Sequence, residues 1–208
     1  QKLHLNFQDS PVIAEALAKI LFNLSTKQTE LNEFETTVEK LQQLYLHFQD
    51  SPVIAEALAK ILFNLSIKQT ESNEFETTAE KLQQLYLHFQ DSPVIAEALA
   101  KILFNLSIKQ TESNEIETTA EKLQKLHLNF QDSPVIAEAL AKILFNLSTK
   151  QTELNEFETT VEKLQVLQQQ FQDSNDIALQ YAKILFNLSI EQTELNEFET
   201  TVEKLQVL

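Results

Sequence analysis

Apolar side chains occupy almost every position of the segment that begins at Pro11. Only Glu15, Lys19 and Asn23 interrupt the apolar run, at intervals of four residues. A helix whose apolar residues cover nearly its whole circumference has to be covered on several sides. The pattern predicts a helix from Pro11 to about Lys27, because Ser10 is a good N-cap and proline suits the first helical position.

A different pattern follows, with one apolar stripe instead of an apolar circumference. Its apolar residues are three or four positions apart: Phe34, Val38, Leu41, Leu44, Tyr45 and Phe48. This spacing predicts a second helix with one side facing water. We expect Asn32 to cap it and Glu35 to complete a capping box. The helix should end before Pro52, because the residue before a proline avoids the helical region.

The pair of helices recurs with a period of 41 residues, marked by Asp9, Asp50, Asp91, Asp132 and Asp173. The stretch SPVIAEALAKILFNLS opens at Ser10 and is repeated at Ser51, Ser92 and Ser133; a changed copy opens at Ser174. Such periods are typical of stacked repeats, in which each copy buries its apolar surface against the next. We therefore expect one domain over residues 1–208, with repeats at approximately 3–43, 44–84, 85–125, 126–166 and 167–207.

These helix pairs, with AEAL after the junction proline, resemble tetratricopeptide repeats. Leu17 stands at the large position of that family's consensus, Ile20 at its leucine position and Pro11 at its proline position, which is repeated as Pro52, Pro93 and Pro134. The resemblance covers the whole chain, with two departures: the unit exceeds the family's length of about 34 residues, and Leu21 stands where the family prefers Gly or Ala. The resemblance implies an all-α, right-handed α-solenoid of five tandem helix-turn-helix repeats, with the first helices lining its concave face.

The composition excludes several classes of function. The chain has no Gly and no Cys, which argues against glycine-rich phosphate loops, disulfides and cysteine zinc sites. Its net charge of −15 argues against nucleic acid as a partner. No apolar run approaches the roughly 20 residues of a membrane span, and we expect no membrane partner. Because the first residue is Gln, we expect the chain to be a fragment, and we expect it to be cytoplasmic.

The polar line on the first helices is the candidate binding surface. In tetratricopeptide proteins the corresponding face commonly binds peptides, and an amide and a lysine at regular intervals can hold a peptide backbone or a carboxylate. The alternative is a solvated seam with weak Glu–Lys pairs along each helix. The candidate residues are Glu15, Lys19, Asn23, Glu56, Lys60, Asn64, Glu97, Lys101, Asn105, Glu138, Lys142 and Asn146.

Catalysis, metals and cofactors have little support in the sequence. His47 and His88 are equivalent positions one repeat apart, too far for both to reach an ion at about 2 Å. No histidine lies near a Ser or Asp in a pattern typical of a catalytic triad, so we expect neither an enzyme nor a cofactor. The NLS tripeptides that begin at Asn23 and its equivalents match a glycosylation sequon, but they lie in a mostly buried helix, and we interpret them as chance matches.

The two ends of the chain indicate a second possibility. The chain opens with what matches the final turns of a second helix and closes with a second helix that lacks those turns, so the ends look complementary. This pattern favours head-to-tail association of copies of the chain. Such an assembly would grow into a filament unless it closed into a ring. The alternative is that changes such as Leu179 and Tyr181 cap the stack. The candidate residues are Leu3, Leu5, Phe7, Leu179, Tyr181, Leu205 and Leu208. The sequence thus predicts a non-catalytic protein-binding scaffold, with a self-associating array as the alternative.

Overall fold

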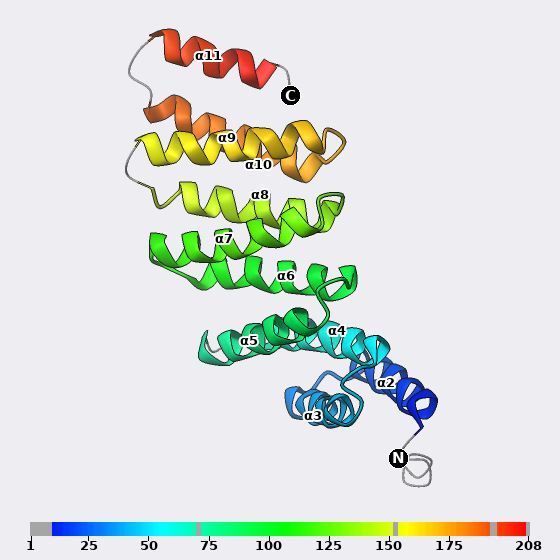
Figure 1. Cartoon of the computed structure of the whole chain (residues 1–208). Coiled ribbons are helices and arrows are strands. Elements are labelled where there is room, and N and C mark those ends of the chain that lie inside the picture. Colours follow the sequence, from blue (N-terminus) through cyan, green and yellow to red (C-terminus); the bar gives the residue numbers. More distant parts are fainter. Residues whose placement is uncertain (1–9, 70–71, 152–153, 192–194, 207–208) are drawn as a thin grey trace. The chain divides into compact units, whose positions relative to one another are not determined.

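The structure, a computed structural model, describes residues 10–69, 72–151, 154–191 and 195–206. Every regular element in these ranges is an α-helix (Figure 1). The helices are α2 (Pro11–Ser25), α3 (Leu31–His47), α4 (Pro52–Lys68), α5 (Ser72–His88), α6 (Pro93–Lys109), α7 (Ser113–Asn129), α8 (Pro134–Ser148), α9 (Leu154–Gln170), α10 (Asn175–Glu191) and α11 (Leu195–Gln206). The predicted all-α fold is confirmed. We call α2, α4, α6, α8 and α10 the first helices, and the others the second helices.

The chain divides into two compact units, Gln1–Ile102 and Leu103–Leu208, and the division falls inside α6. In the first unit, α4 packs against α2, α3 and α5, and α2 also packs against α3. In the second unit, α8 packs against α7, α9 and α10, and α10 also packs against α9 and α11. Consecutive helices are therefore in contact within each unit, and a first helix also contacts a neighbouring first helix.

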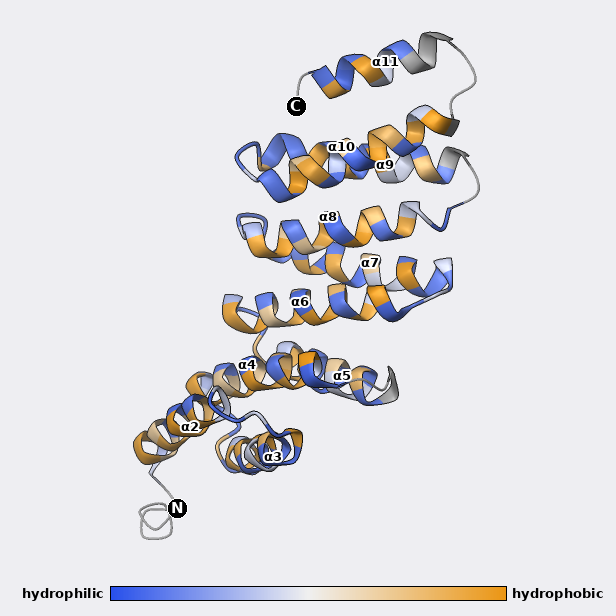
Figure 2. Cartoon of the chain, turned by 180° about the vertical axis from the view of Figure 1, so that it is seen from behind, coloured by the Kyte–Doolittle hydropathy of each residue, from blue (hydrophilic) through white to orange (hydrophobic). Residues whose placement is uncertain are grey.

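The core of each unit is built mainly on the first helices, as the sequence predicts. In α4, Ala57, Leu58, Ala59 and Ile61 are all buried, and the three consecutive residues among them cannot share one face. The second helices instead bury one stripe, and Figure 2 shows the contrast between the mainly hydrophobic α2 and the alternating colours of α11. Fully burying one such aliphatic side chain stabilises a fold by about 1.5–3 kcal/mol.

The first helices begin as predicted, but the second helices begin differently. The hydroxyl of Ser51 accepts a hydrogen bond from the Ile54 amide (3.4 Å), and Pro52 occupies the first turn of α4. In α3 the N-cap is Glu30, not Asn32, because the backbone of Glu30 is extended and its carbonyl accepts the first helical bond from the Phe34 amide (3.2 Å). The predicted capping box at the start of α3 is therefore wrong.

The first helices end at two different places. Helices α2 and α8 have 15 residues, whereas α4 and α6 have 17. The hydroxyl of Thr26 donates to the Asn23 carbonyl (2.8 Å), and Thr149 donates to the Asn146 carbonyl (2.7 Å). Such side-chain bonds compete with continued helix. Isoleucine stands at this position in the longer helices, as Ile67, and so the helix continues for two more residues.

Candidate functional site

The glutamates of the polar line join one first helix to the start of the next. The Ser51 hydroxyl donates to Glu15 Oε1, and the Ser92 hydroxyl donates to Glu56 Oε1, both at 2.9 Å. In the second unit, Ser174 donates to Glu138 at the same distance of 2.9 Å. Each of these serines also accepts a bond from the backbone amide three residues later. The carboxylate therefore orients the capping serine of the following helix. Glu97 occupies the same position on α6.

Two lysines of the polar line, and Lys183 of α10, lie over phenylalanine rings of the preceding first helix. Lys101 Nζ is 5.7 Å from the centroid of Phe63, and Lys142 Nζ is 5.9 Å from the centroid of Phe104. Lys183 repeats the contact over Phe145 at 5.5 Å. An ammonium over an aromatic face at such a distance is attracted by the ring quadrupole. The rings therefore fix where these cations lie on the surface.

Lys142 has a second partner, the carboxylate of an aspartate. Its Nζ is 2.7 Å from Asp176 Oδ2, a residue in the first turn of α10. Both side chains remain partly accessible to solvent. Lys142 thus contacts the ring of Phe104 on the preceding first helix and the carboxylate of Asp176 on the following first helix.

The asparagines of the line show one contact between helices. The Asn146 side-chain amide donates to the Ser107 hydroxyl at 3.3 Å, and Ser107 is buried. Asn64 and Asn105 are partly exposed, and Asn23 is exposed. The lysines Lys19, Lys60 and Lys101 are also exposed. The candidate residues therefore include glutamates that are bound to serines, three exposed lysines, the ion-paired Lys142, and amides of mixed accessibility.

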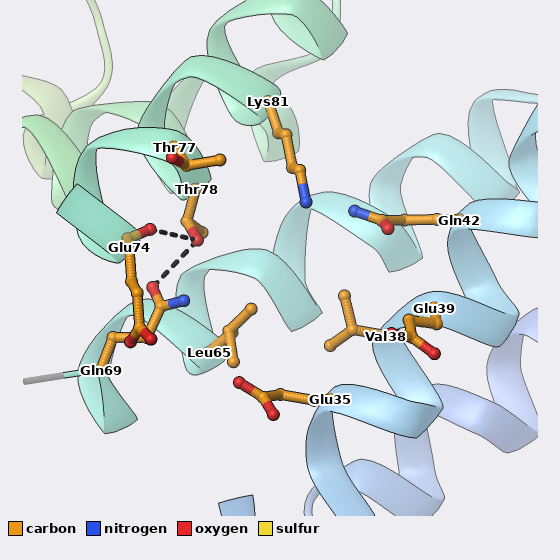
Figure 3. Close-up of a pocket in the computed structure, with 10 residues that line it drawn as sticks. All are labelled: Glu35, Val38, Glu39, Gln42, Leu65, Gln69, Glu74, Thr77, Thr78 and Lys81. Atoms are coloured by element: carbon orange, nitrogen blue, oxygen red, sulfur yellow. Dashed lines mark hydrogen bonds between the residues drawn. The ribbon is translucent and has the colours of Figure 1, made fainter. Parts of the chain in front are cut away.

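A groove of about 400 Å³ lies between α3, α4 and α5 (Figure 3). Leu65 of α4 and Val38 of α3 face each other within it, and Glu35, Glu39 and Lys81 lie around them (Figure 3). Glu39 and Lys81 are exposed, as expected for the solvent-facing side of a second helix. The groove thus forms where a second helix packs beside the next first helix.

One wall of this groove contains a contact that recurs along the chain. The Thr78 hydroxyl is 2.9 Å from Gln69 Oε1 and 3.0 Å from the Glu74 carbonyl. Thr119 and Gln110 repeat the side-chain contact at 3.0 Å, as do Thr160 and Gln151 at the same distance. Sequence reasoning missed these pairs, although the constant spacing of nine residues between Gln and Thr was visible. They tie the end of a first helix to the start of its second helix.

A second cavity, of about 360 Å³, lies between α7, α8 and α9. His127 lines it and is buried, and its Nδ1 atom has no hydrogen-bond partner. Burial lowers the pKa of this imidazole, and a hydrogen bond with the Gln170 side chain opposes that shift. Positions 45 and 86 carry tyrosine where position 127 carries histidine. Sequence reasoning considered His47 and His88 instead, and both of these are exposed.

The candidate self-association residues have varied positions. Leu3, Leu5, Phe7 and Leu208 lie outside the described residues. Leu179 is exposed, and Leu205 is partly exposed. Tyr181 is buried, its hydroxyl has no hydrogen-bond partner, and burial raises its pKa. Tyr181 therefore belongs to the interior of the second unit.

Comparison with known proteins adds no relative to this description. A scan against protein-family models, a search of curated proteins and a search of solved structures each found no match. Within the described ranges, no helix is long and apolar enough to cross a membrane. The same residues contain no group of three or more His, Cys, Asp or Glu side chains that could hold a metal ion. The fold is that of an all-helical chain packed in adjacent helix pairs, which is compatible with a helical repeat protein.

Proposed function

We propose that this protein is a non-catalytic interaction scaffold that binds carboxylate-bearing peptides on the face lined by its first helices. The finer fold proposed with it is the right-handed, tetratricopeptide-like solenoid of five helix pairs. The period of the sequence and the recurring contacts between consecutive helices support this fold. The proposed ligand is an acidic side chain or a C-terminal carboxylate in an extended peptide.

The ion pair between Lys142 and Asp176 carries the proposal. The carboxylate of Asp176 lies 2.7 Å from an ammonium that is itself 5.9 Å above the ring of Phe104. We take this pair as the template for an acidic ligand at an equivalent lysine. A hydrogen bond between two charged groups is about twice as strong as one between neutral groups. Because solvent screens an exposed pair, one such contact contributes up to about 1 kcal/mol to binding.

In the first unit, the place of Asp176 is taken by an apolar residue. Val94 stands 34 residues after Lys60, as Asp176 stands 34 residues after Lys142. The side chain of Lys60 is exposed and has no hydrogen bond or ion pair within the described part of the chain. Asn64 lies one turn further along α4 and is partly exposed, so its amide is available to a peptide backbone. A ligand carboxylate at Lys60 would thus supply what Asp176 supplies in the second unit.

The test is a binding titration with fluorescent peptides of eight to ten residues that contain or lack acidic side chains, with free or amidated C-termini. We expect peptides with carboxylates to bind, and the double variant Lys60→Glu/Lys101→Glu to weaken binding at least about tenfold, since it replaces attraction by repulsion. Lys81→Glu is the matched control, because Lys81 is exposed on second helix α5. Equal affinity for peptides with and without carboxylates, or an equal loss of affinity in Lys81→Glu, would contradict the proposal.

A second variant tests the geometry directly. Val94→Asp places a carboxylate at the position that Asp176 has in the second unit, and it should compete with the ligand at Lys60. We expect weaker binding of acidic peptides by Val94→Asp, and little change with Val94→Asn, which has similar size and no charge. Equal binding by the wild type and Val94→Asp would mean that the lysine of the first unit does not bind the ligand.

A further inference from the structure

One side of α2 is an apolar stripe that nothing in the described residues covers. Val12, Ala16, Ile20 and Leu24 lie four residues apart, and all four are exposed. The exposed fraction of Ile20 is 62%. Ile61, at the same position of α4, is fully buried. The surface of α4 that is equivalent to this stripe is therefore covered by packing within the chain.

The contacts of α4 show what kind of surface covers such a stripe. Helix α4 packs against α2 and α3, which are the first and second helices that precede it. Leu65, the equivalent of Leu24, lies beside Val38 of α3 in the groove of Figure 3. On α4, the helices that pack against the equivalent of the stripe are thus a first helix and its second helix.

Helices α10 and α11 present such a surface without a helix upon it. Phe186 of α10 has an exposed fraction of 62%, whereas the equivalent Phe145 lies beneath Lys183 and is partly buried. On α11, Val202 and Leu205 are partly exposed. Their equivalents on α9, Val161 and Leu164, are buried. The same side chains that are covered on α8 and α9 are therefore uncovered on α10 and α11.

We propose that α2 of one copy of this chain packs against α10 and α11 of a second copy, in the register in which α4 packs against α2 and α3. In this register Ile20 and Leu24 lie against α10 and α11, and Lys19 lies over the ring of Phe186, as Lys101 lies over Phe63. The contact joins two different surfaces, so each copy can bind one neighbour through α2 and another through α10 and α11. It does not depend on the binding of a peptide at Lys60 or Lys101, although it uses Lys19, which is another residue of the polar line.

Five positions near the start of α10 differ from their equivalents in α2, and one of them makes the register testable. The carboxylate that binds a capping serine, as Glu15 binds Ser51, is replaced on α10 by Leu179. Ser10 of the second copy would therefore meet an exposed leucine and lack its carboxylate. Introducing Leu179→Glu restores the pair in the proposed register, whereas it only adds a charge in any other arrangement.

The first experiment measures molar mass by light scattering over about a hundredfold range of concentration at two salt levels. We expect the mass of the wild type to rise with concentration, and to rise more at high salt, because the net charge of −15 on each copy opposes association. Ile20→Glu and Phe186→Glu should each weaken association at least about a hundredfold, since each buries a charge in an apolar contact. Both residues are exposed, so neither change disturbs the folded monomer.

Mixing the two variants tests whether the contact joins unlike surfaces. Ile20→Glu leaves α10 and α11 intact, and Phe186→Glu leaves α2 intact. An equimolar mixture should therefore form a one-to-one dimer and nothing larger. A contact of α2 with α2 would instead leave Phe186→Glu fully associated on its own. Either that result or a mixture that stays monomeric overturns the proposal.

Two control variants separate this contact from general stickiness. Ile67 has the same exposed fraction as Ile20, 62%, but lies outside the stripe, so Ile67→Glu should leave association unchanged. Leu179→Glu should preserve or strengthen association. Equal losses from Ile67→Glu and Ile20→Glu, or loss of association with Leu179→Glu, contradict the register. A wild-type mass that stays monomeric at every concentration and salt level overturns the contact itself.

Discussion

Helix α2 and the first fifteen residues of α4 have the same sequence, PVIAEALAKILFNLS, yet their surroundings differ. Both segments are helical. Ile20 is 62% exposed and Ile61 is fully buried. Ser51 caps α4 through its side chain, whereas Ser10 makes no such bond to α2. One sequence thus has two very different sets of contacts.

The comparison separates what local sequence decides from what neighbours decide. Helix formation depends on propensity and on proline at the first turn, and these are equal in the two segments. Burial depends on what packs against the helix, and only α4 has a helix pair before it among the described residues. In repeat proteins, stability is accordingly close to a sum of repeat and neighbour terms. Identical substitutions in α2 and α4 should therefore have unequal effects.

The largest difference is expected at the isoleucine. Ile61→Ala should lower the free energy of unfolding by about 2–5 kcal/mol, because it leaves a cavity in a packed site. Ile20→Ala should cost less than about 1 kcal/mol, since most of the side chain is already in water. Urea titration followed by circular dichroism, at a concentration where the chain is monomeric, measures both. Equal losses would show that the two helices have the same surroundings in solution.

A second comparison of this kind involves two tyrosines. Tyr181 is buried with an unpartnered hydroxyl, whereas Tyr45 is only partly buried. A buried polar group without a partner costs about 1–3 kcal/mol. Tyr181→Phe should therefore stabilise the protein by about 1–2 kcal/mol, and Tyr45→Phe should change little. The midpoint of urea unfolding checks both variants, and a loss of stability in Tyr181→Phe would mean that the hydroxyl has a partner, such as a bound water.

The helices and their two types could be predicted from the sequence because these features are local. The serine–proline pair fixes where α2, α4, α6 and α8 start. The contrast between an apolar circumference and an apolar stripe indicates which type of helix is covered on more sides. The predicted start of α3 is wrong. The sequence favours Asn32 as the N-cap, but Glu30, whose backbone is extended, is the N-cap in the structure. Helix boundaries depend on such small differences between adjacent residues.

The roles of the polar line could not be predicted in the same way. Ser51 and Glu15 are 36 residues apart, and only the stacking of α4 on α2 brings them together. The pairing of Lys142 with Asp176 likewise depends on how α10 packs against α8. The sequence showed that these residues recur, but their partners come from tertiary packing.

The serine comparison should give the next largest effect. Ser51 accepts from the Ile54 amide and donates to Glu15, so Ser51→Ala removes both bonds. Loss of an N-cap typically costs about 1 kcal/mol. Ser10→Ala should cost much less, because Ser10 has no side-chain cap bond. Unfolding titrations of the two alanine variants and of Glu15→Ala test this. If the bond to Glu15 matters, the Ser51→Ala and Glu15→Ala losses will not add in the double variant.

The smallest effect is expected at the lysine. Lys101 Nζ lies 5.7 Å from the ring centroid of Phe63, whereas Lys19 has no ring contact within the described residues. An exposed contact between a cation and a ring contributes about 0.5–1 kcal/mol. Lys101→Met, which keeps the aliphatic stem and removes the charge, should lose about that amount, and Lys19→Met should lose less. Replacing Phe63 by Leu should abolish the difference between the two methionine variants. If the difference persists without the ring, the position of Lys101 is set by the packing of α6 and not by attraction to Phe63.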